Sequence, residues 1–277
     1  MGDFGEDTEV RAVPGGWRAQ LSRDWEIWGP NGGYVAAVAL RAAGAASELP
    51  RPISFAGHFL SVADFEEVTL EVTTLRRAKH AESLRVSMTQ AGKPVFEALV
   101  WAGADGLSGL EHAECPMPAA ERPRALPSVE ELLPPDARRT TFPFWDNLEC
   151  RPINWVLWED REPGPAHALD WYRFRPRPTF DDPWLDAARS LLLIDTMVWP
   201  AACRHHVRQE EFVAPSLDVR ASFHALEPQS EYLLVDARSP VGRDGLVGGE
   251  AAVFSESGTL LASGAAQLLC RPVRNAS

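Results

Sequence analysis

Two segments of the chain are apolar over the length of a helix. Residues 34–46 are almost wholly small and apolar, and only Arg41 interrupts them. A helix that is apolar on all sides belongs inside a protein, so we expect a sheet to wrap around it. The second segment, residues 182–199, begins with Asp182, a good helix cap, and Pro183, which suits the first helical position because it lacks an N–H. The sequence therefore predicts two buried helices.

Segments with strand-like alternation surround both helices. In the first half the expected strands cover residues 53–60, 68–75, 83–90 and 95–101, and we expect a four-stranded antiparallel meander. Ala91-Gly92-Lys93-Pro94 predicts a tight hairpin between the last two. In the second half the strand-like segments are residues 155–158, 169–174, 215–224, 231–237 and 261–269.

The order of the elements repeats with a period near 165 residues. Phe223 stands 164 positions after Phe59, and Gly258 stands 166 positions after the hairpin residue Gly92. Two copies of a buried helix, each held by an antiparallel sheet, form the hot dog arrangement. We therefore predict an α+β tandem double hot dog with an N-terminal hot dog at 1–102, a Pro-rich crossover linker at 103–150 and a C-terminal hot dog at 151–277. One short helix is expected near residues 129–133 of the linker.

One carboxylate interrupts the apolar stripe of the second helix. Steps of three and four residues place Asp195 on the same stripe as Leu191, Leu192 and Val198. Desolvation of such a carboxyl raises its pKa, which suits a general base, although a structural Asp paired with a neighbouring backbone group or Arg is the alternative. The first half offers Asn31-Gly32-Gly33 and no acid in the matching place. A purely structural duplication has no reason to keep the acid in one copy only, which favours a functional Asp195.

Two polar residues of the second half are candidates to act with Asp195. Ser216 opens a strand whose Leu217, Val219, Ala221 and Phe223 are expected to face inward, and the alternative for it is a turn or capping serine. Gln267 is the only large polar residue of the apolar final strand, and the alternative for it is a core amide bonded to backbone. A carboxylate, a hydroxyl and an amide could together orient a water whose proton the carboxylate takes.

Composition and charge exclude several classes of function. With 27 basic and 39 acidic residues the net charge is −12, which argues against binding to nucleic acid or to an anionic membrane. No apolar run reaches the roughly 20 residues of a membrane span, and the acidic first ten residues do not resemble a signal peptide, so we expect a cytoplasmic protein. The four cysteines show no metal-binding spacing, and no Gly-rich phosphate loop or nucleophile elbow is present, so we expect no metal and no cofactor.

Many short segments follow one another in a characteristic order: Gly32-Gly33 before the alanine-rich helix, Gln90 to Phe96, Asp195 with Pro200-Ala201, Ser216-Leu217-Asp218, and Gln267 with Arg271. In this order they resemble the acyl-CoA thioesterase II family of double hot dog hydrolases over nearly the whole chain. The resemblance implies hydrolysis of an acyl-CoA thioester by a homo-oligomer, with Asp195, Ser216 and Gln267 activating the water. It also makes Asn31, Gly32, Gly33 and Tyr34 candidates to line the substrate channel.

One departure from the family pattern concerns Gln267. It stands one position out of register relative to Arg271, and a shift of one residue turns a strand side chain to the other face unless a bulge corrects it. A displaced Gln267 fits the main alternative, a non-catalytic hot dog protein that binds acyl-CoA or a partner protein.

Other residues leave further alternatives open. Arg76, Arg77 and Lys79 could meet the phosphates of CoA or be solvated surface charges. A hydratase or dehydratase would need an Asp–His pair, for which His58, His80 and His224 are available.

Overall fold

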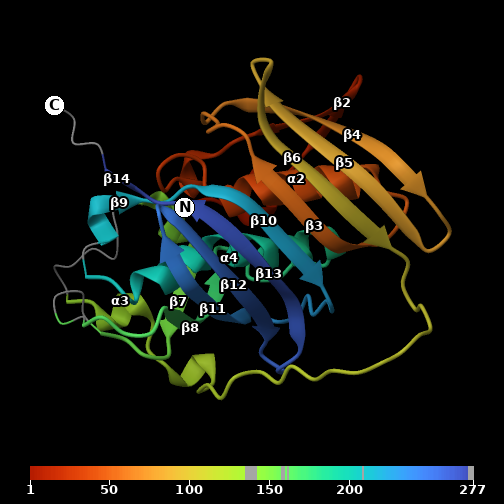
Figure 1. The fold of residues 1–277 in the computed structure, drawn as a ribbon. Helices are drawn as coiled ribbons and strands as arrows, with labels where there is room; N and C mark the ends of the chain where they lie inside the picture. Colours follow the sequence, from red (N-terminus) through yellow and green to blue (C-terminus); the bar gives the residue numbers. More distant parts are fainter. Residues whose placement is uncertain (135–141, 157–159, 161, 208, 274–277) are drawn as a thin grey trace.

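The computed structural model describes residues 1–134, 142–156, 160, 162–207 and 209–273, and most of the strands in these ranges belong to one curved antiparallel sheet (Figure 1). The sheet has 12 strands in the order β1-β2-β4-β5-β6-β3-β10-β13-β12-β11-β8-β7. Their bounds are β1 Arg11–Val13, β2 Gly16–Gln20, β3 Arg51–Phe59, β4 Glu67–Arg77, β5 Ala81–Gln90, β6 Lys93–Gly103, β7 Leu148–Pro152, β8 His167–Phe174, β10 Ser216–Phe223, β11 Tyr232–Arg243, β12 Leu246–Ser255 and β13 Leu260–Leu269. A separate short pair consists of β9 Phe212–Val213 and β14 Arg271–Pro272.

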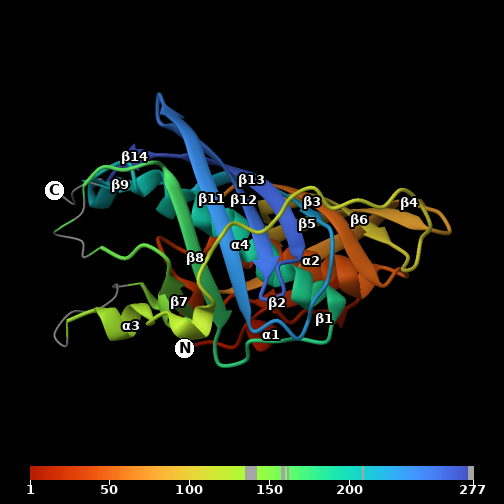
Figure 2. The same cartoon turned by 90° about the horizontal axis from the view of Figure 1, so that it is seen from below.

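Two long helices lie inside the curve of the sheet, as the sequence predicted (Figure 2). They are α2 Gly32–Ala46 and α4 Pro183–Cys203. Asp182 caps α4, since its side chain accepts hydrogen bonds from the N–H groups of Trp184 and Leu185. The remaining helical segments are short: α1 Phe4–Asp7, α3 Val129–Leu132 and 3-10 turns at Arg23–Trp25, Pro123–Ala125, Pro143–Asn147 and Gln209–Glu211.

The two halves of the sheet mirror each other across the β3–β10 pair. Outward from that pair the order is β6-β5-β4-β2 on one side and β13-β12-β11-β8 on the other. Ala56 of β3 pairs with Arg220 of β10, and these positions differ by the predicted period. The double hot dog prediction is therefore confirmed. The predicted meander is wrong in one respect, because β3 pairs with β6 rather than with β4.

Hairpins join corresponding strands in the two halves. Ala91 and Gly92 between β5 and β6 have φ of 48° and 78°, and Gly258 between β12 and β13 has a φ of 98°. Positive φ is cheap for glycine, and two successive residues with positive φ match the right-handed twist of a two-residue hairpin. The turn predicted at residues 91–94 is confirmed.

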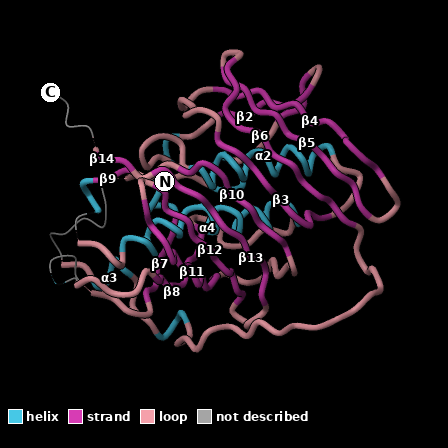
Figure 3. Tube along the Cα trace, in the orientation of Figure 1, coloured by secondary structure: helices cyan, strands magenta, loops and turns pink. Residues whose placement is uncertain are grey.

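The segment after β6 crosses the outside of the molecule, as expected of a crossover linker (Figure 3), and α3 at Val129–Leu132 lies where the short helix was predicted. Two other features of the connection differ from expectation. A strand, β7 at Leu148–Pro152, begins within the predicted linker. The strand expected at 155–158 is absent at Trp155 and Val156, while its last two residues lie outside the described ranges. The proposed boundaries at 102/103 and 150/151 stay predictions.

The two helices pack against each other at glycines. A Cβ built on Gly33 would lie 2.6 Å from the backbone oxygen of Leu192, and one built on Gly44 would lie 2.6 Å from the ring of Trp184. Small residues let helix backbones approach closely. The start of α2 therefore lies against the middle of α4, which places it beside Asp195.

Candidate active site

Asp195 is buried in the middle of α4, opposite the first turn of α2. Only 2% of the surface of Asp195 is exposed to solvent. A Cβ built on Gly32 would lie only 2.7 Å from Oδ2 of Asp195 and 3.1 Å from the ring of Phe59. Any larger residue at position 32 would therefore press on the carboxylate, so the glycine is what allows the start of α2 to approach it.

The electrostatic environment of Asp195 raises its pKa from an ordinary 3.8 to about 7. Burial is the largest cause, and the negative charge of Asp218 adds to it. The Ser216 hydroxyl and the Gly33 backbone N–H donate hydrogen bonds to the carboxylate. These bonds lower the pKa and so oppose part of the rise. Oδ1 accepts no hydrogen bond within the described residues. A carboxyl with a pKa close to 7 and a free oxygen is suited to exchange a proton at neutral pH.

Asn31 fixes the start of α2 relative to α4. Its Oδ1 accepts a hydrogen bond from the N–H of Tyr34 at 3.0 Å, which caps α2. Its Nδ2 donates to the hydroxyl of Thr196, next to Asp195, at 3.1 Å. The first N–H groups of α2, at Gly32 and Gly33, have no partner within the helix, and the N-terminus of a helix favours negative charge. The arrangement can therefore stabilise an anion beside Asp195.

Ser216 faces the helices because of a β-bulge. Its Cα partner on β13 is Leu268, a buried residue that packs with Val198 of α4. The register shifts between Ser216 and Asp218, which leaves Leu217 as the extra residue. Leu217 is 38% exposed, so the expectation that it faces inward is wrong. The bulge exchanges the faces of these two residues and brings the serine, rather than the leucine, to the side of Asp195.

Gln267 lies on the other face of the sheet. It pairs with Asp218 on one side and Gly248 on the other, and all three line a shallow depression on the outer surface. The next residue back, Ala266, faces the helices and is 3% exposed. No bulge in β13 opposite β10 corrects the slip at this position, so the structure does not bring Gln267 to Asp195.

Tyr34 also cannot take the position expected of it. The residue is fully buried, its hydroxyl donates to the backbone oxygen of Asp7 at 2.7 Å, and it accepts from the N–H of Ser22 at 3.0 Å. Its ring stacks on Trp25. Tyr34 therefore holds the N-terminal segment onto α2 and presents nothing to a substrate.

The histidines and basic residues considered from the sequence lie away from Asp195. His224 follows the far end of β10 from Ser216 and contacts the hydroxyl of Ser263 at 2.9 Å, and His58 pairs with Asp218 on the outer face. Arg77 forms an ion pair with the buried Glu82 at 2.6 Å at the β4–β5 hairpin. The structure thus does not support a hydratase or dehydratase, which would need a histidine beside Asp195. It also does not support a phosphate site at Arg77.

Thr196 was not identified from the sequence as part of this site. Its hydroxyl holds Asn31, and through it the first turn of α2, against α4. The available signal was a second polar residue next to Asp195 in an otherwise apolar stretch.

The described residues contain no cluster of three or more potential metal ligands. None of the described helices is both long and apolar enough to cross a membrane.

These features define a double hot dog protein with a buried acid where its two helices meet. Residues 21–103 match the family model of the acyl-CoA thioesterase N-terminal domain, and residues 123–270 match that of the acyl-CoA thioesterase C-terminal domain. The chain therefore belongs to the acyl-CoA thioesterase family. No curated protein matches it in a sequence search.

Solved structures share the fold over the full length. An acyl-CoA thioesterase II, TesB2, from Mycobacterium marinum is 22% identical with a TM-score of 0.79, covering 98% of this chain and 99% of that one. A hot dog protein of unknown function from Alicyclobacillus acidocaldarius is 21% identical with a TM-score of 0.81, covering 99% and 100%. The tesB protein of Mycobacterium avium subspecies paratuberculosis is 22% identical with a TM-score of 0.78, covering 97% and 98%. At this level of identity the likeness concerns the fold.

Proposed function

We propose that the protein hydrolyses acyl-CoA thioesters to a free acid and CoA. One observation supports this more than any other: the buried carboxyl of Asp195, with a pKa of about 7 and an unpartnered oxygen, faces the start of α2. A base beside a helix start that can stabilise an anion is the combination that attack on a carbonyl requires. Membership of the acyl-CoA thioesterase family supplies the thioester as the substrate.

In the proposed reaction Asp195 acts as the general base. A water held by Asp195 and the Ser216 hydroxyl attacks the thioester carbon, and its proton passes to the carboxylate. The carbonyl oxygen becomes an oxyanion beside the N–H group of Gly32, since the N–H of Gly33 bonds the Asp195 carboxylate. Collapse of this intermediate breaks the carbon–sulfur bond, and the thiolate of CoA takes the proton from Asp195. Direct attack by the carboxylate on the thioester is the other route open to this geometry.

Gln267 has no part in this mechanism, because its side chain lies on the outer face of the sheet. That absence is the specific observation in favour of a second candidate function, an acyl-CoA-binding protein without hydrolytic activity. Ala266 occupies the inward position on β13 and offers no hydrogen bond to a water. The water would then be held by two protein side chains instead of three.

Thiol release from a panel of short, medium, long and aromatic acyl-CoAs separates the two candidates. We expect steady release by the wild type and a loss of at least 100-fold, on the order expected for a general base, in Asp195→Asn. Ser216→Ala should also lose activity, whereas Ser216→Thr retains the hydroxyl and should retain most of it. Tight binding of acyl-CoA without any thiol release by the wild type would favour the binding protein instead.

A further inference from the structure

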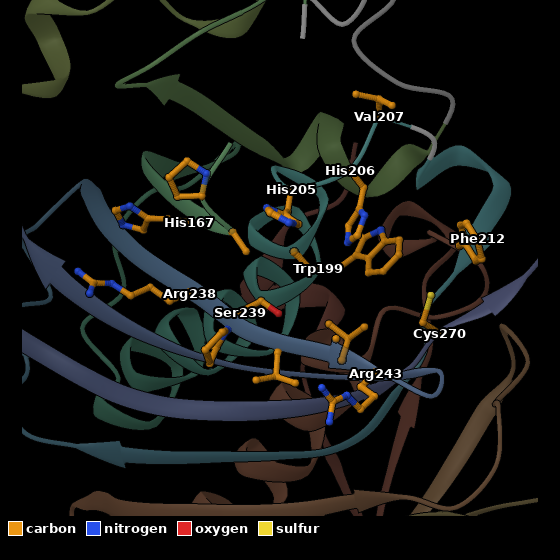
Figure 4. Close-up of a pocket in the computed structure, with 17 residues that line it drawn as sticks. His167, Trp199, His205, His206, Val207, Phe212, Arg238, Ser239, Arg243 and Cys270 are labelled. Atoms are coloured by element: carbon orange, nitrogen blue, oxygen red, sulfur yellow. The ribbon is translucent and has the colours of Figure 1, made fainter. Parts of the chain in front are cut away.

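A large pocket lies at the C-terminal end of α4, outside the Asp195 site (Figure 4). It has a volume of about 1140 Å³ and is bordered by the end of α4, the residues preceding β8, and the β11–β12 hairpin. Trp199, Ala202, Phe212 and Val247 give it an apolar, partly aromatic interior. A pocket of this size is large enough for a nucleotide cofactor or a substantial part of one.

The charged residues among the described residues that line this pocket are both arginines, Arg238 and Arg243. Three histidines, His167, His205 and His206, also border it, and no Asp or Glu is among the described lining residues, in a chain whose net charge is −12. Figure 4 shows these side chains arranged around Trp199. Such a local reversal of charge attracts an anion.

The basic residues differ in how far their charge is compensated. Asp236 accepts hydrogen bonds from Arg238 at 3.3 Å and contacts His167 at 2.7 Å, so it balances much of the charge on that side. The guanidinium of Arg243, at the end of β11, forms no hydrogen bond or ion pair with the residues that the structure describes. An exposed guanidinium at the edge of an aromatic pocket is a suitable partner for a phosphate.

The pocket lies near the Asp195 site across the inner face of the sheet, and the residues between them, Leu268 and Val247, are buried in one cluster with Val198 and Ala202 of α4. Ser216 pairs with Leu268, Leu268 with Val247, and Val247 with Gly242, so the four residues form one row across four strands. Three strand spacings of about 4.8 Å place Gly242 roughly 14 Å from Ser216. On the helix side, Trp199 stands one turn after Asp195 and lines the pocket.

We propose that this pocket binds the phosphorylated nucleotide end of CoA, with the pantetheine arm spanning the distance from the pocket to Ser216. This inference rests on the proposed function. The arm between the thioester sulfur and the first phosphorus has about as many bonds as four residues of backbone, so it spans roughly 14 Å when extended. That length matches the separation between the two sites. The purine stacks on the aromatic interior and the phosphates pair with Arg243.

Calorimetric binding of CoA, of 3′-phospho-ADP and of pantetheine to the full chain tests the proposal without any need for hydrolysis. We expect Arg243→Ala to weaken the binding of CoA and of 3′-phospho-ADP by about tenfold, since one charge-assisted hydrogen bond is lost. The affinity for pantetheine should be unchanged. Val241→Glu, at a 60% exposed pocket residue, adds a negative charge there and should weaken the same two ligands. Arg243→Lys, which keeps the charge, should recover part of the affinity.

Matched controls come from the other half of the molecule, where β4 occupies the place that β11 takes here. Arg76→Ala and Leu75→Glu change an exposed Arg and a 52% exposed apolar residue near the end of β4, and should leave the affinity for CoA unchanged. Equal affinities of wild type and Arg243→Ala for CoA would overturn the proposal even if acyl-CoA hydrolysis is observed. If the pocket variants change KM according to the acyl group of the substrate and not through the nucleotide, the pocket holds the acyl chain. That result would also overturn the proposal. Failure of hydrolysis with intact, Arg243-dependent CoA binding would refute only the proposed function.

Discussion

Replacing Asp195 by Asn should make the protein less sensitive to pH, because the replacement removes the buried group that titrates near neutrality. In the folded chain the pKa of Asp195 is about 7, against an ordinary 3.8. Between these two values the unfolded chain has lost the proton and the folded chain still holds it. Stability therefore falls as pH rises through this window. The penalty is absent below pH 3.8 and complete above pH 7, which is the opposite of the behaviour of an Asp stabilised by an ion pair.

The magnitude follows from the shift. Each pKa unit corresponds to about 1.36 kcal/mol, so a shift of about three units costs on the order of 4 kcal/mol at high pH. Most of that cost, about 2–3 kcal/mol, develops between pH 5 and pH 8. The Asn variant carries a constant difference from the changed packing and hydrogen bonding but none of this pH-dependent cost.

The assay is urea unfolding of the wild type and of Asp195→Asn at several pH values from 5 to 9. The difference in unfolding free energy should shift in favour of the variant by about 2–3 kcal/mol over this range and level off above pH 8. Asp218→Asn serves as the control, since it keeps the buried acid and should retain the pH dependence with a lower midpoint. A difference that stays constant from pH 5 to 9 would show that Asp195 does not titrate there, and the general-base argument would lose its basis. The pH profile of kcat/KM should rise with the same midpoint near 7.

Three further substitutions test other parts of the description. Gln267→Ala should leave kcat within about twofold of the wild type, because the side chain lies on the outer face, and a loss of 100-fold in thiol release would refute that placement. Tyr34→Phe should lower the unfolding free energy by about 1–3 kcal/mol, since the partly buried N–H of Ser22 loses its acceptor, with KM for acyl-CoA unchanged in kinetic assays. Arg189→Ala should cost about 3–5 kcal/mol in denaturant unfolding because Asp186, 4% exposed, is left as an unpaired buried acid; a neutral result would mean that the pair is not buried as described.

The elements of the fold could be predicted from local patterns. The two apolar segments gave both buried helices, with Asp182 as the cap of α4, and Gly92 and Gly258 marked equivalent hairpins. These signals are local, because a cap, a positive φ or an apolar run is set by neighbouring residues. The order of the strands in the sheet was harder to predict from the sequence. β3 and β6 are separated by two strands in the sequence, and nothing local in either one shows that they pair.

The site could be predicted only where no change of register intervenes. The inward position of Asp195 follows from helical periodicity, and α4 has that periodicity. Ser216 and Leu217 exchange faces because of one extra residue in β10, and alternation alone cannot place a bulge. For Gln267 the count from Arg271 gave the correct warning, since one residue of displacement is sufficient to move a side chain to the outer surface. Tyr34 was misplaced because its partners, Asp7 and Ser22, are distant in sequence.

The two halves share one architecture but do not supply equivalent chemistry. The start of α2 meets Asp195 at Gly32, where a Cβ would lie 2.7 Å from the carboxylate, and in the proposed reaction the N–H of Gly32 faces the carbonyl oxygen. The start of α4 meets α2 at Gly44, and there the ring of Trp184 fills the space that a ligand would need. An acid introduced into α2 would therefore not create a second site unless Trp184 were also reduced in size. The duplication supplies two helix starts, and side-chain volume at Gly32 and Trp184 distinguishes them: the first meets a carboxylate through a glycine, and the second is filled by an indole ring.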